Sequence, residues 1–395
     1  MTDGKVHYID EETISGKRIL LRADFDVSLN PNFTIADDAR IRNNLPTIKF
    51  LLRNHNRIIC VAKLDRPKER NPQLSLMVVV KRLQEYLPAV KITLVNDFLT
   101  EKTPFQNQTE NEIVVLENIR FYPEEKQNNE EFAKKLAALA DVYVDDAFAM
   151  AHRPEASVVG VPHLIPSYGG LLLKKEIMMI SKAIEKPKKP FVAIIGGAKI
   201  DTKINLVGKL TEIADYVLIG GGLANTFLCA HGYEIGKSYC EYEKVAKARQ
   251  LLFLAAQKHT AVILPSDVVI GDPQNPNDAG QIKKIDNIPP GAQILDIGPE
   301  TQAKFGAIIS KAKTIVWNGP VGYIENPSFK RGTDFIYYSI THNPEAVSVV
   351  GGGDTLSAIS KEEYLNKITH ISTGGGAMLE FIEKGTLPGI EALKR

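Results

Sequence analysis

The sequence contains few cysteines, and their positions exclude two kinds of stabilising site. Only three of the 395 residues are cysteine, Cys60, Cys229 and Cys240, and no two of them form a C-x-x-C pair. An odd number of widely spaced cysteines supports neither a disulfide framework nor a structural zinc site. The eight histidines are also scattered, with no pair at metal-ligand spacing. We therefore expect reduced thiols and no zinc centre.

Long hydrophobic runs and an excess of one charge are missing as well. No run approaches the ~18 apolar residues that a membrane span requires, and the N-terminus lacks the charged-then-apolar layout of a signal peptide. With 48 Lys and Arg against 47 Asp and Glu, the net charge is +1. Such a balance argues against binding nucleic acid or membranes through bulk charge. These absences predict a cytoplasmic protein that binds neither.

Three common motifs are also absent. No segment has the P-loop pattern G-x-x-x-x-G-K-[ST], and no glycine cluster has the dinucleotide pattern G-x-G-x-x-G. The G-x-S-x-G turn of serine hydrolases is missing too. Any phosphate site in this chain must therefore be built in another way.

The first half of the chain repeats an apolar strand that ends in charged residues. The residues after the four strand ends include Arg22, Asp24 and Asp26, then Lys63 and Arg66, then Arg120, then Arg153. Helical patterns alternate with these strands, which predicts a parallel sheet with helices on both faces and ligands at the carboxyl ends of the strands. The cations, with Arg40 at the first helical region, would converge on a small, multiply charged anion. Any single arginine is more often exposed or structurally paired.

The second half repeats a strand that runs into a glycine cluster and then into a helical stretch. The clusters are 196–197, 220–222, 351–353 and 374–376. Free N–H groups at a glycine turn and a helix N-terminus favour anions, so four such turns on one sheet edge predict a polyphosphate site. Asp354 and Thr355, directly after one cluster, are good N-cap residues. Asp354 is either a plain helix cap or an Mg²⁺ ligand beside a phosphate.

Other residues near the glycine clusters carry candidate ligand groups. Lys199 and Lys203 are four residues apart, so a helix after Gly197 would place both ammonium groups on one face. A shared anion explains this spacing better than helix stability does, and an exposed lysine face is the alternative. Glu325 follows a rigid turn and would either accept hydrogen bonds from a ribose or simply be exposed.

A break near residues 170–190 divides the two halves. Apolar residues recur at helical spacing across 171–185, and Pro187 to Pro190 then end the helix. We expect an α/β fold with two doubly wound parallel-sheet (Rossmann-like) domains joined by an interdomain helix and hinge. The predicted divisions are 1–170, the helix and linker 171–190, 191–372 and a C-terminal segment 373–395.

Taken together, these stretches resemble the phosphoglycerate kinase family over essentially the whole chain. The matching segments include Arg22-Ala-Asp-Phe-Asp-Val, Glu117-Asn-Ile-Arg-Phe, Trp317-Asn-Gly-Pro-Val-Gly, Gly351-Gly-Gly-Asp-Thr and His370-Ile-Ser-Thr-Gly-Gly-Gly-Ala. The resemblance implies a glycolytic and gluconeogenic hinge kinase that transfers a phosphoryl group reversibly between ATP and the carboxylate of 3-phosphoglycerate. It also implies ATP or ADP as co-substrate, Mg²⁺, a monomer, and a C-terminal segment that packs towards the first domain.

The resemblance also assigns roles to individual residues. Phosphoglycerate binding is assigned to Asp24, Phe25, Asp26, Arg40, Lys63, Arg66, Arg120 and Arg153. Nucleotide binding is assigned to Gly197, Lys203, Gly221, Asn318, Pro320, Glu325, Gly352, Gly353, Asp354 and Thr355, with Asp354 as the metal ligand. Because the acceptor carboxylate is already ionised, no general base is needed. Charge neutralisation during transfer then rests on Arg40, Lys199 and the turns at Gly352 and Gly375.

The chain departs from the family pattern on the side that would bind the acidic substrate. The departures are Asp26, Lys63, Asp65, Asp145, Ala149 and Glu155. Asp26 adds a negative charge beside an anionic substrate unless Arg22 or Lys63 pairs with it, and we expect Lys63 and Asp65 to compensate each other. Two alternatives therefore stand beside the kinase: a non-catalytic relative that binds nucleotide, and a phosphotransferase that acts on another small acid.

Overall fold

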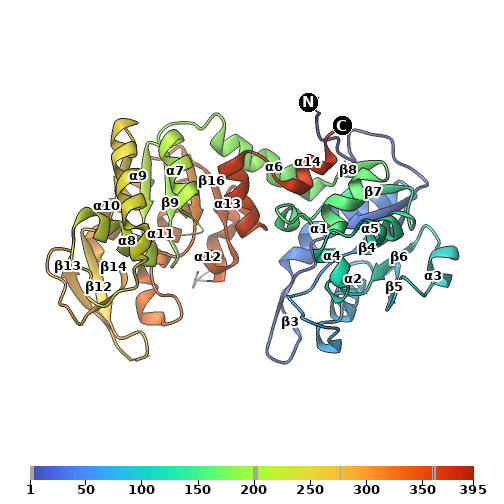
Figure 1. Cartoon of the computed structure of the whole chain (residues 1–395), viewed down its shortest axis with the longest axis horizontal. Helices are drawn as coiled ribbons and strands as arrows, with labels where there is room; N and C mark the ends of the chain where they lie inside the picture. Colours follow the sequence, from blue (N-terminus) through green and yellow to red (C-terminus); the bar gives the residue numbers. More distant parts are fainter. Residues whose placement is uncertain (1–3, 199–202, 276, 358, 360–361) are drawn as a thin grey trace. The chain divides into compact units, whose positions relative to one another are not determined.

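The computed structural model describes residues 4–198, 203–275, 277–357, 359 and 362–395, with only the backbone of Asp354, Ser357 and Glu362. The chain forms two compact units (Figure 1). Unit 1 comprises Met1–Met178 together with Thr386–Arg395, and unit 2 comprises Met179–Gly385. Within the described ranges, no helix combines the length and the apolar composition needed to cross a membrane.

The described part of unit 1 is built on a six-stranded parallel sheet. Its spatial order is β5-β6-β4-β1-β7-β8, and the strands are β1 (Arg18–Arg22), β4 (Arg57–Val61), β5 (Lys91–Val95), β6 (Glu112–Leu116), β7 (Val142–Asp145) and β8 (Ser167–Gly169). Every residue of β6 and β7 is buried. Such continuous burial is typical of parallel strands that are covered on both faces.

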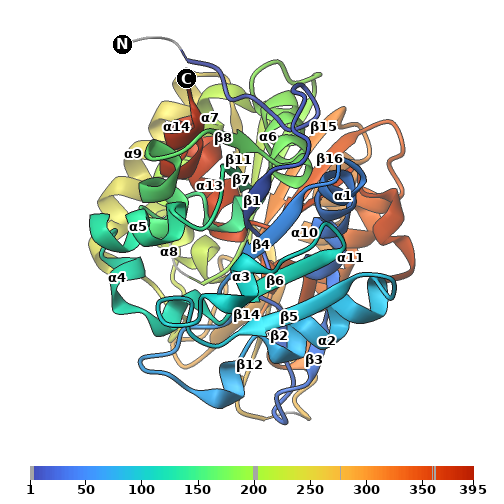
Figure 2. The same ribbon diagram turned by 90° about the vertical axis from the view of Figure 1, so that its right-hand side faces the viewer.

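Helices cover both faces of this sheet. They are α1 (Ala39–Arg53), α2 (Met77–Tyr86), α3 (Thr103–Gln106), α4 (Pro123–Lys126) and α5 (Glu130–Ala137). Figure 2 shows α1 and α2 on one side of the sheet and α5 on the other. The side chain of Asn129 caps α5 by accepting from the Phe132 N–H at 2.9 Å. A short antiparallel hairpin, β2 (Ser28–Leu29) and β3 (Ile35–Asp37), precedes α1.

The chain leaves unit 1 through α6 (Leu171–Ile184) and returns to it at its end. The last helix, α14 (Pro388–Leu393), packs in unit 1, where the Gly389 N–H donates to Ala151 O at 2.8 Å. Lys394 forms a β-bridge with Val6. The compact units divide the chain after Met178 and Gly385, whereas the divisions predicted from the sequence follow residues 170, 190 and 372.

Within the described ranges, unit 2 also contains a six-stranded parallel sheet, in the order β11-β10-β9-β15-β16-β17. Its strands are β9 (Phe191–Ile195), β10 (Tyr216–Ile219), β11 (Ala261–Ile263), β15 (Thr314–Asn318), β16 (Val347–Gly351) and β17 (His370–Ser372). Its helices are α7 (Ile204–Ile213), α8 (Gly221–His231), α9 (Val245–Gln257), α10 (Pro299–Ile309), α11 (Arg331–Thr341), α12 (Gly353–Ser357) and α13 (Gly375–Lys384). The fully buried indole of Trp317 lies in its core.

A second, antiparallel sheet in unit 2 was not predicted from the sequence. It consists of β12 (Asp267–Gly271), β13 (Gln281–Lys284) and β14 (Gln293–Ile297), with β12 in the middle. These strands are drawn in yellow and orange tones in Figure 1. Isoleucines of β12 and β14 pack with Leu228 of α8 in a small, separate hydrophobic core. This sheet forms part of the wall of a cavity described below.

Candidate active site

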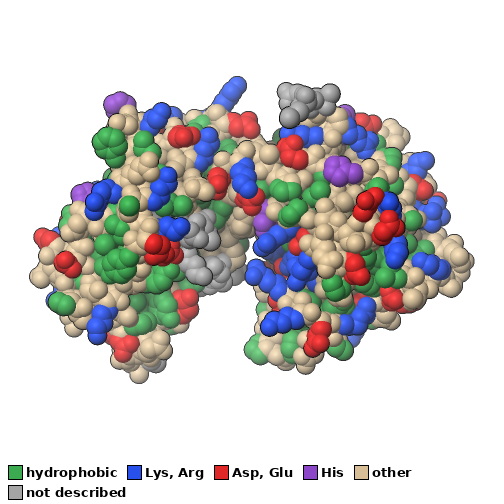
Figure 3. All heavy atoms as spheres, viewed as in Figure 1, with side chains coloured by type: hydrophobic (Ala, Val, Ile, Leu, Met, Phe, Trp, Pro, Cys, Tyr) green, Lys and Arg blue, Asp and Glu red, His purple; other side chains and the backbone are tan. Residues whose placement is uncertain are grey.

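The cations predicted in unit 1 follow the carboxyl ends of neighbouring strands. In the parallel register, Arg22 at the end of β1 lies opposite Val61 of β4 and Asp145 of β7. Figure 3 shows Lys and Arg side chains gathered on one part of the unit 1 surface. Arg66 and Arg153 are both exposed. The sheet therefore brings the charged strand ends to one edge, as the alternation of strands and helices predicted.

Arg40, near the start of α1, is held by Asp24. Its Nη1 donates to Asp24 Oδ1 at 2.7 Å, and only 1% of the Asp24 side chain is exposed. Burial tends to lower the pKa of Arg40, but the charge of Asp24 and its hydrogen bond raise that pKa above its usual value. Asn44, one turn along α1, accepts from the Asp24 N–H at 3.2 Å. The protein itself thus orients the Arg40 guanidinium.

Lys63 pairs with Asp26, one of the two partners that the sequence allowed for this carboxylate. The Lys63 ammonium donates to Asp26 Oδ2, and the Asp65 N–H donates to Asp26 Oδ1 at 2.8 Å. Burial lowers the pKa of Lys63, and the charge of Asp26 opposes that shift.

The predicted compensation between Lys63 and Asp65 is therefore wrong. The carboxylate that neutralises Lys63 belongs to Asp26, and Asp65 contributes its backbone N–H. Asp65 is exposed and has a φ of +58°. This left-handed conformation, which Asp tolerates better than most residues, turns the chain so that the Asp65 N–H faces Asp26.

Arg120 faces Glu155, a pairing that the sequence does not indicate. Arg120 Nη2 lies 2.7 and 3.0 Å from the two carboxylate oxygens, and the two side chains are 9% and 8% exposed. Burial lowers the pKa of Arg120, and the charge of Glu155 opposes the shift. The two residues are 35 positions apart, so no local pattern links them.

Two residues predicted near the anion are instead enclosed within unit 1. Arg22 is fully buried, with its Nε donating to Ser157 Oγ at 2.9 Å and its Nη1 donating to Ala23 O at 2.8 Å. Phe25 is fully buried in the hydrophobic core of the unit. The expectation that these two side chains line the site is corrected, because both are packed inside the unit.

The glycine turns of unit 2 let neighbouring strand ends approach closely. The Gly197 N–H donates to Pro320 O at 2.7 Å, and the Gly221 N–H donates to Val321 O at 2.9 Å. A Cβ at Gly196 would lie 2.1 Å from Pro320 O, which excludes every other residue type there. The turns after β9, β10 and β15 thus form one glycine-rich wall.

A cavity of about 430 Å³ lies against three of the four predicted glycine turns. Its lining comprises Gly197, Ala198, Lys203, Asn318, Gly319, Pro320, Gly352, Gly353, Thr355, Gly375, Gly376 and Leu379. Asn318 Nδ2 donates to Gly351 O at 2.7 Å, and Lys203 Nζ donates to Gly196 O. The structure therefore gathers most of the residues predicted to bind nucleotide around one space, which we call the glycine-lined cavity.

A larger cavity of about 510 Å³ adjoins the glycine-lined cavity, since Gly197, Ala198 and Pro320 line both. Its other lining residues include Gly221, Leu228, Val268, Ile294, Leu295 and Glu325. We call it the β14 cavity. An apolar pocket next to a glycine wall suits a ligand with a flat apolar part and a phosphorylated part.

The turn after β16 differs from its prediction. Helix α12 begins at Gly353, so neither Asp354 nor Thr355 is its N-cap. Gly352, with a φ of +107°, makes the reversal before the helix. The Thr355 hydroxyl instead accepts from the Gly319 N–H at 2.7 Å and donates to Gly351 O at 3.0 Å. Thr355 therefore ties the end of β16 to the turn after β15.

The proposed roles of Lys199 and Asp354 stay predictions. Lys199 and the side chain of Asp354 lie outside the part of the chain that the structure describes. Helix α7 begins at Ile204, so Lys203 precedes this helix rather than standing on its face as predicted. Among the described residues, no three His, Cys, Asp or Glu side chains form a group that could hold a metal ion.

Comparison with protein families matches residues 9–385 to the family described as phosphoglycerate kinase. The chain belongs to this family. The predicted family is confirmed, and so is the predicted fold class of two α/β units built on parallel sheets. The hinge stays a prediction.

Relatives and solved structures of phosphoglycerate kinases match nearly the whole chain. The phosphoglycerate kinase of Dictyoglomus turgidum is 47% identical over 388 residues, which is 97% of each chain. A cytosolic phosphoglycerate kinase of Arabidopsis thaliana is 41% identical and covers 99% of each chain. The structures from Coxiella burnetii and Pyrococcus horikoshii have TM-scores of 0.87 and 0.83, at 38% and 30% identity, and cover 98% of each chain.

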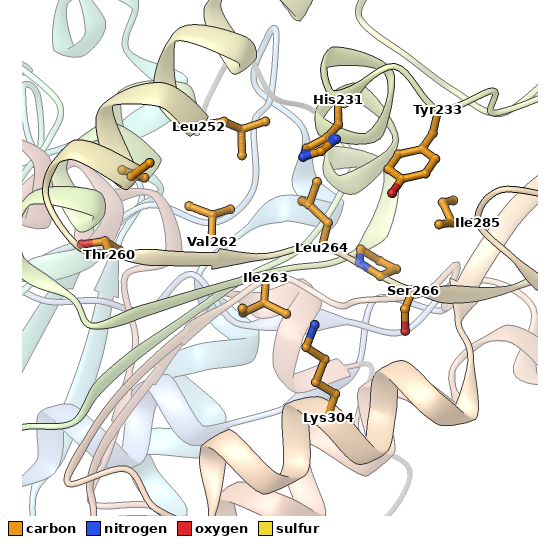
Figure 4. A pocket seen from close by; sticks show the side chains of 13 residues that line it. His231, Tyr233, Leu252, Thr260, Val262, Ile263, Leu264, Ser266, Ile285 and Lys304 are labelled. Atoms are coloured by element: carbon orange, nitrogen blue, oxygen red, sulfur yellow. The ribbon is translucent and has the colours of Figure 1, made fainter.

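Another cavity of unit 2, of about 410 Å³, lies apart from the residues that we predict to bind substrate and nucleotide. Figure 4 shows His231 and Tyr233 on one side of β11 and Lys304, from α10, on the other. The rings of His231 and Tyr233 stack with centroids 5.6 Å apart. The described lining includes none of the residues predicted to bind substrate or nucleotide, so the candidate active site lies elsewhere.

Proposed function

We propose that this chain transfers a phosphoryl group reversibly between ATP and the carboxylate of 3-phosphoglycerate, giving ADP and 1,3-bisphosphoglycerate. The observation that carries the proposal is the pair of adjoining cavities in unit 2, in a member of the phosphoglycerate kinase family. Family membership over nearly the full chain favours neither the non-catalytic relative nor a phosphotransferase for another acid.

The nucleotide would bind across the two cavities of unit 2. The β14 cavity would take the base and the ribose, beside Glu325, and the glycine-lined cavity would take the phosphates, beside Lys203. Backbone N–H groups can face an anion where α13 begins with glycine, whereas at the start of α8 the Gly221 N–H already donates to Val321 O.

3-Phosphoglycerate would bind to the cations of unit 1. The proposed ligands are Arg40, Lys63, Arg66, Arg120 and Arg153, with Asp24 and Asp26 as orienting partners. Guanidinium groups suit this substrate because they bind phosphate and carboxylate through two parallel hydrogen bonds. Three of the cations already contact a carboxylate, so their directions are set before the substrate arrives.

The reaction needs positioning and charge neutralisation more than acid–base chemistry. A carboxylate oxygen of 3-phosphoglycerate forms a bond to the γ-phosphorus of ATP, and the bond from that phosphorus to ADP breaks with its electron pair leaving on ADP. No proton has to be removed, because the attacking carboxylate is ionised at neutral pH. We assign charge neutralisation to Arg40, Lys199 and the backbone N–H groups of Gly352 and Gly375.

The donor set beside the glycine-lined cavity fits Mg²⁺ bound largely through the nucleotide. Mg²⁺ takes oxygen ligands and usually one or two carboxylates together with substrate phosphates. Thr355 is already engaged with Gly319 and Gly351, and Asp354 directly follows Gly353 of the cavity wall. Asp354 would therefore hold the ion, which neutralises phosphate charge when bound.

The proposal includes closure of the two units about α6, because two substrates held on different units must come within bonding distance. Closure would also exclude water, which competes with the carboxylate for the phosphoryl group. We further propose a cytoplasmic monomer. Relatives from Arabidopsis thaliana and Nicotiana tabacum are named cytosolic, and light scattering tests the monomer.

A coupled assay tests the proposed activity. Purified protein is mixed with Mg-ATP and 3-phosphoglycerate, and glyceraldehyde-3-phosphate dehydrogenase reports 1,3-bisphosphoglycerate by oxidising NADH. We expect NADH oxidation that stops when ATP, 3-phosphoglycerate or Mg²⁺ is left out. Retained ATP binding without turnover would favour the non-catalytic relative, and turnover only with another acid would favour a different phosphotransferase.

A further inference from the structure

A buried carboxylate, Asp296, lines the β14 cavity without belonging to the predicted set. It lies in β14 and is 3% exposed. Its Oδ1 accepts from the Ile297 N–H and its Oδ2 from the Gly332 N–H, both at 2.8 Å. Gly332 is the second residue of α11, so the carboxylate also lies at the positive end of a helix dipole. Both oxygens are therefore engaged with the backbone.

Asp296 contacts both ends of one segment, residues 322–332. A Cβ at Gly322 would lie 2.4 Å from Asp296 Oδ1, and so would a Cβ at Gly332. The Tyr323 N–H donates to Leu295 O at 2.7 Å, which joins the segment to β14 beside Asp296. Residues 322–325, with Glu325 among them, line the same cavity. The carboxylate thus holds the end of the segment through the Gly332 N–H, and the glycine at the start of the segment lets the carboxylate lie close against it.

We propose that Asp296 is a positioning residue for the nucleoside part of the bound nucleotide. It fixes the segment 322–332 against β14 and thereby holds Glu325 in the cavity wall. This inference rests on the function proposed above, because that function supplies the nucleotide. Asp296 acts through the segment and needs no contact with the nucleotide itself.

The ionisation of Asp296 gives the anchor a pH dependence. Burial raises the pKa of Asp296 to about 7, and the hydrogen bonds from Gly332 and Ile297 oppose the shift. Protonation removes a charge-assisted acceptor, so the anchor weakens as the pH falls through about 7. We therefore expect nucleoside binding to weaken over the same range.

Few other charged groups surround Asp296. On α11, Asp334 raises its pKa and Arg331 lowers it. The elements β12 and α8, which pack against β14, contribute uncharged cavity residues, Val268, Asn225 and Leu228. Besides Arg331, the segment itself carries Glu325 and Lys330.

Asp296→Asn tests the inference against a matched control, Asp267→Asn. Asp267 is also buried, and its carboxylate accepts from the Thr301 and Glu300 N–H groups at 2.7 and 3.0 Å in the first turn of α10. The described lining of the β14 cavity does not include Asp267. Each substitution replaces one accepting oxygen by an NH2 group, which faces a backbone N–H donor. Only Asp296→Asn should loosen the segment 322–332.

We expect Asp296→Asn to raise the dissociation constant of adenosine and the KM for ATP about five- to tenfold. The kcat and the KM for 3-phosphoglycerate should stay within about twofold of the wild type. Asp267→Asn should leave adenosine binding unchanged even where it lowers thermal stability. Wild-type protein should bind adenosine more weakly at about pH 6 than at about pH 8, and Asp296→Asn should lose this dependence. Adenosine has no phosphate that titrates in this range.

Equal losses of adenosine affinity in the two variants, or an unchanged affinity in Asp296→Asn, would overturn the positioning role and leave the proposed function standing. A wild-type protein that binds neither adenosine nor ATP would overturn both. If Asp296→Asn does not fold, the wild-type pH profile decides, because an adenosine affinity that is flat across neutral pH contradicts the anchor.

Discussion

Among the individual residues of unit 1, acidic side chains determine how the cations of the candidate site are presented. Arg40, Lys63 and Arg120 contact the carboxylates of Asp24, Asp26 and Glu155, respectively. A buried cation without a partner costs several kcal/mol. These carboxylates therefore allow the three cations to be partly buried.

The Arg120–Glu155 pair should stabilise unit 1 in the absence of substrate. Glu155→Gln leaves the Arg120 guanidinium buried beside a neutral group, so we expect the free energy of unfolding to fall by about 2–4 kcal/mol. Urea denaturation measures this loss. Glu131→Gln, which breaks an ion pair with Lys134 between exposed side chains, should cost less than about 0.5 kcal/mol. Similar losses in the two variants would contradict a special role for the buried pair.

Asp354 tests the proposed metal site. Asp354→Ala should lower kcat about 100-fold or more and weaken the binding of Mg-ATP, because the ion would lose its protein carboxylate. The rate measured against Mg²⁺ concentration should shift to higher concentrations. Binding of 3-phosphoglycerate, followed by calorimetry, should change little. If turnover survives the substitution, the metal assignment is wrong.

At the scale of elements, unit 2 repeats a strand, a glycine turn and a helix. The turns share a wall because the strand ends are neighbours in the sheet order β10-β9-β15-β16-β17. The absence of side chains lets backbone groups of adjacent turns bond to each other, as Gly196 N–H does with Asn318 O at 2.9 Å. The glycines thus serve the packing of the turns as well as any ligand.

Gly196→Ala should disrupt this wall. The added methyl carbon would lie 2.1 Å from Pro320 O, a backbone atom that has little freedom to move. We expect a loss of about 1–3 kcal/mol in the free energy of unfolding, as for other overpacked sites, together with weaker ATP binding. Gly291→Ala is the control, because a Cβ there meets nothing within 4 Å. Equal ATP affinities in the two variants would refute the close-packed wall.

At the scale of the whole molecule, buried carboxyl groups make stability depend on pH. Burial raises the pKa of Asp146 to about 7 and that of Asp145 to about 6, from a usual value of 3.8. A group with a higher pKa in the folded state gives stability that is fully present below its unfolded pKa. That stability is lost as the pH rises through the folded pKa. These two groups should therefore stabilise the protein less at pH 8 than at pH 5.

Asp146→Asn should remove part of this dependence. Its Oδ1 accepts from the Leu172 and Leu173 N–H groups at 2.8 and 3.2 Å, and an Asn oxygen can keep those bonds. Between about pH 5 and about pH 8, the wild type should lose roughly 2–3 kcal/mol of stability relative to the variant. Denaturant midpoints across this range provide the measurement. Parallel curves for the two proteins would show that Asp146 does not titrate there.

Much of the architecture could be predicted because it depends on short stretches of chain. Alternating apolar strands and helical patterns indicated two parallel-sheet domains, and glycine clusters after strands indicated the glycine-rich wall. The general rule that ligands bind at the carboxyl ends of parallel strands then placed the cations together. Resemblance to the family supplied the substrates and most of the residues predicted to bind them.

The remaining features depend on which distant residues become neighbours, and only the tertiary structure decided them. The partners of Lys63 and Arg120 lie 37 and 35 positions away, so no spacing rule finds them. Burial of Arg22 depends on contacts such as its hydrogen bond to Ser157, which lies 135 positions away. The role inferred for Asp296 depends on a close approach between β14 and two glycines. Sequence by itself therefore determined the two parallel sheets and the family, because both depend on local patterns and motifs, whereas packing decided the antiparallel sheet of unit 2, which charges pair and which side chains are buried.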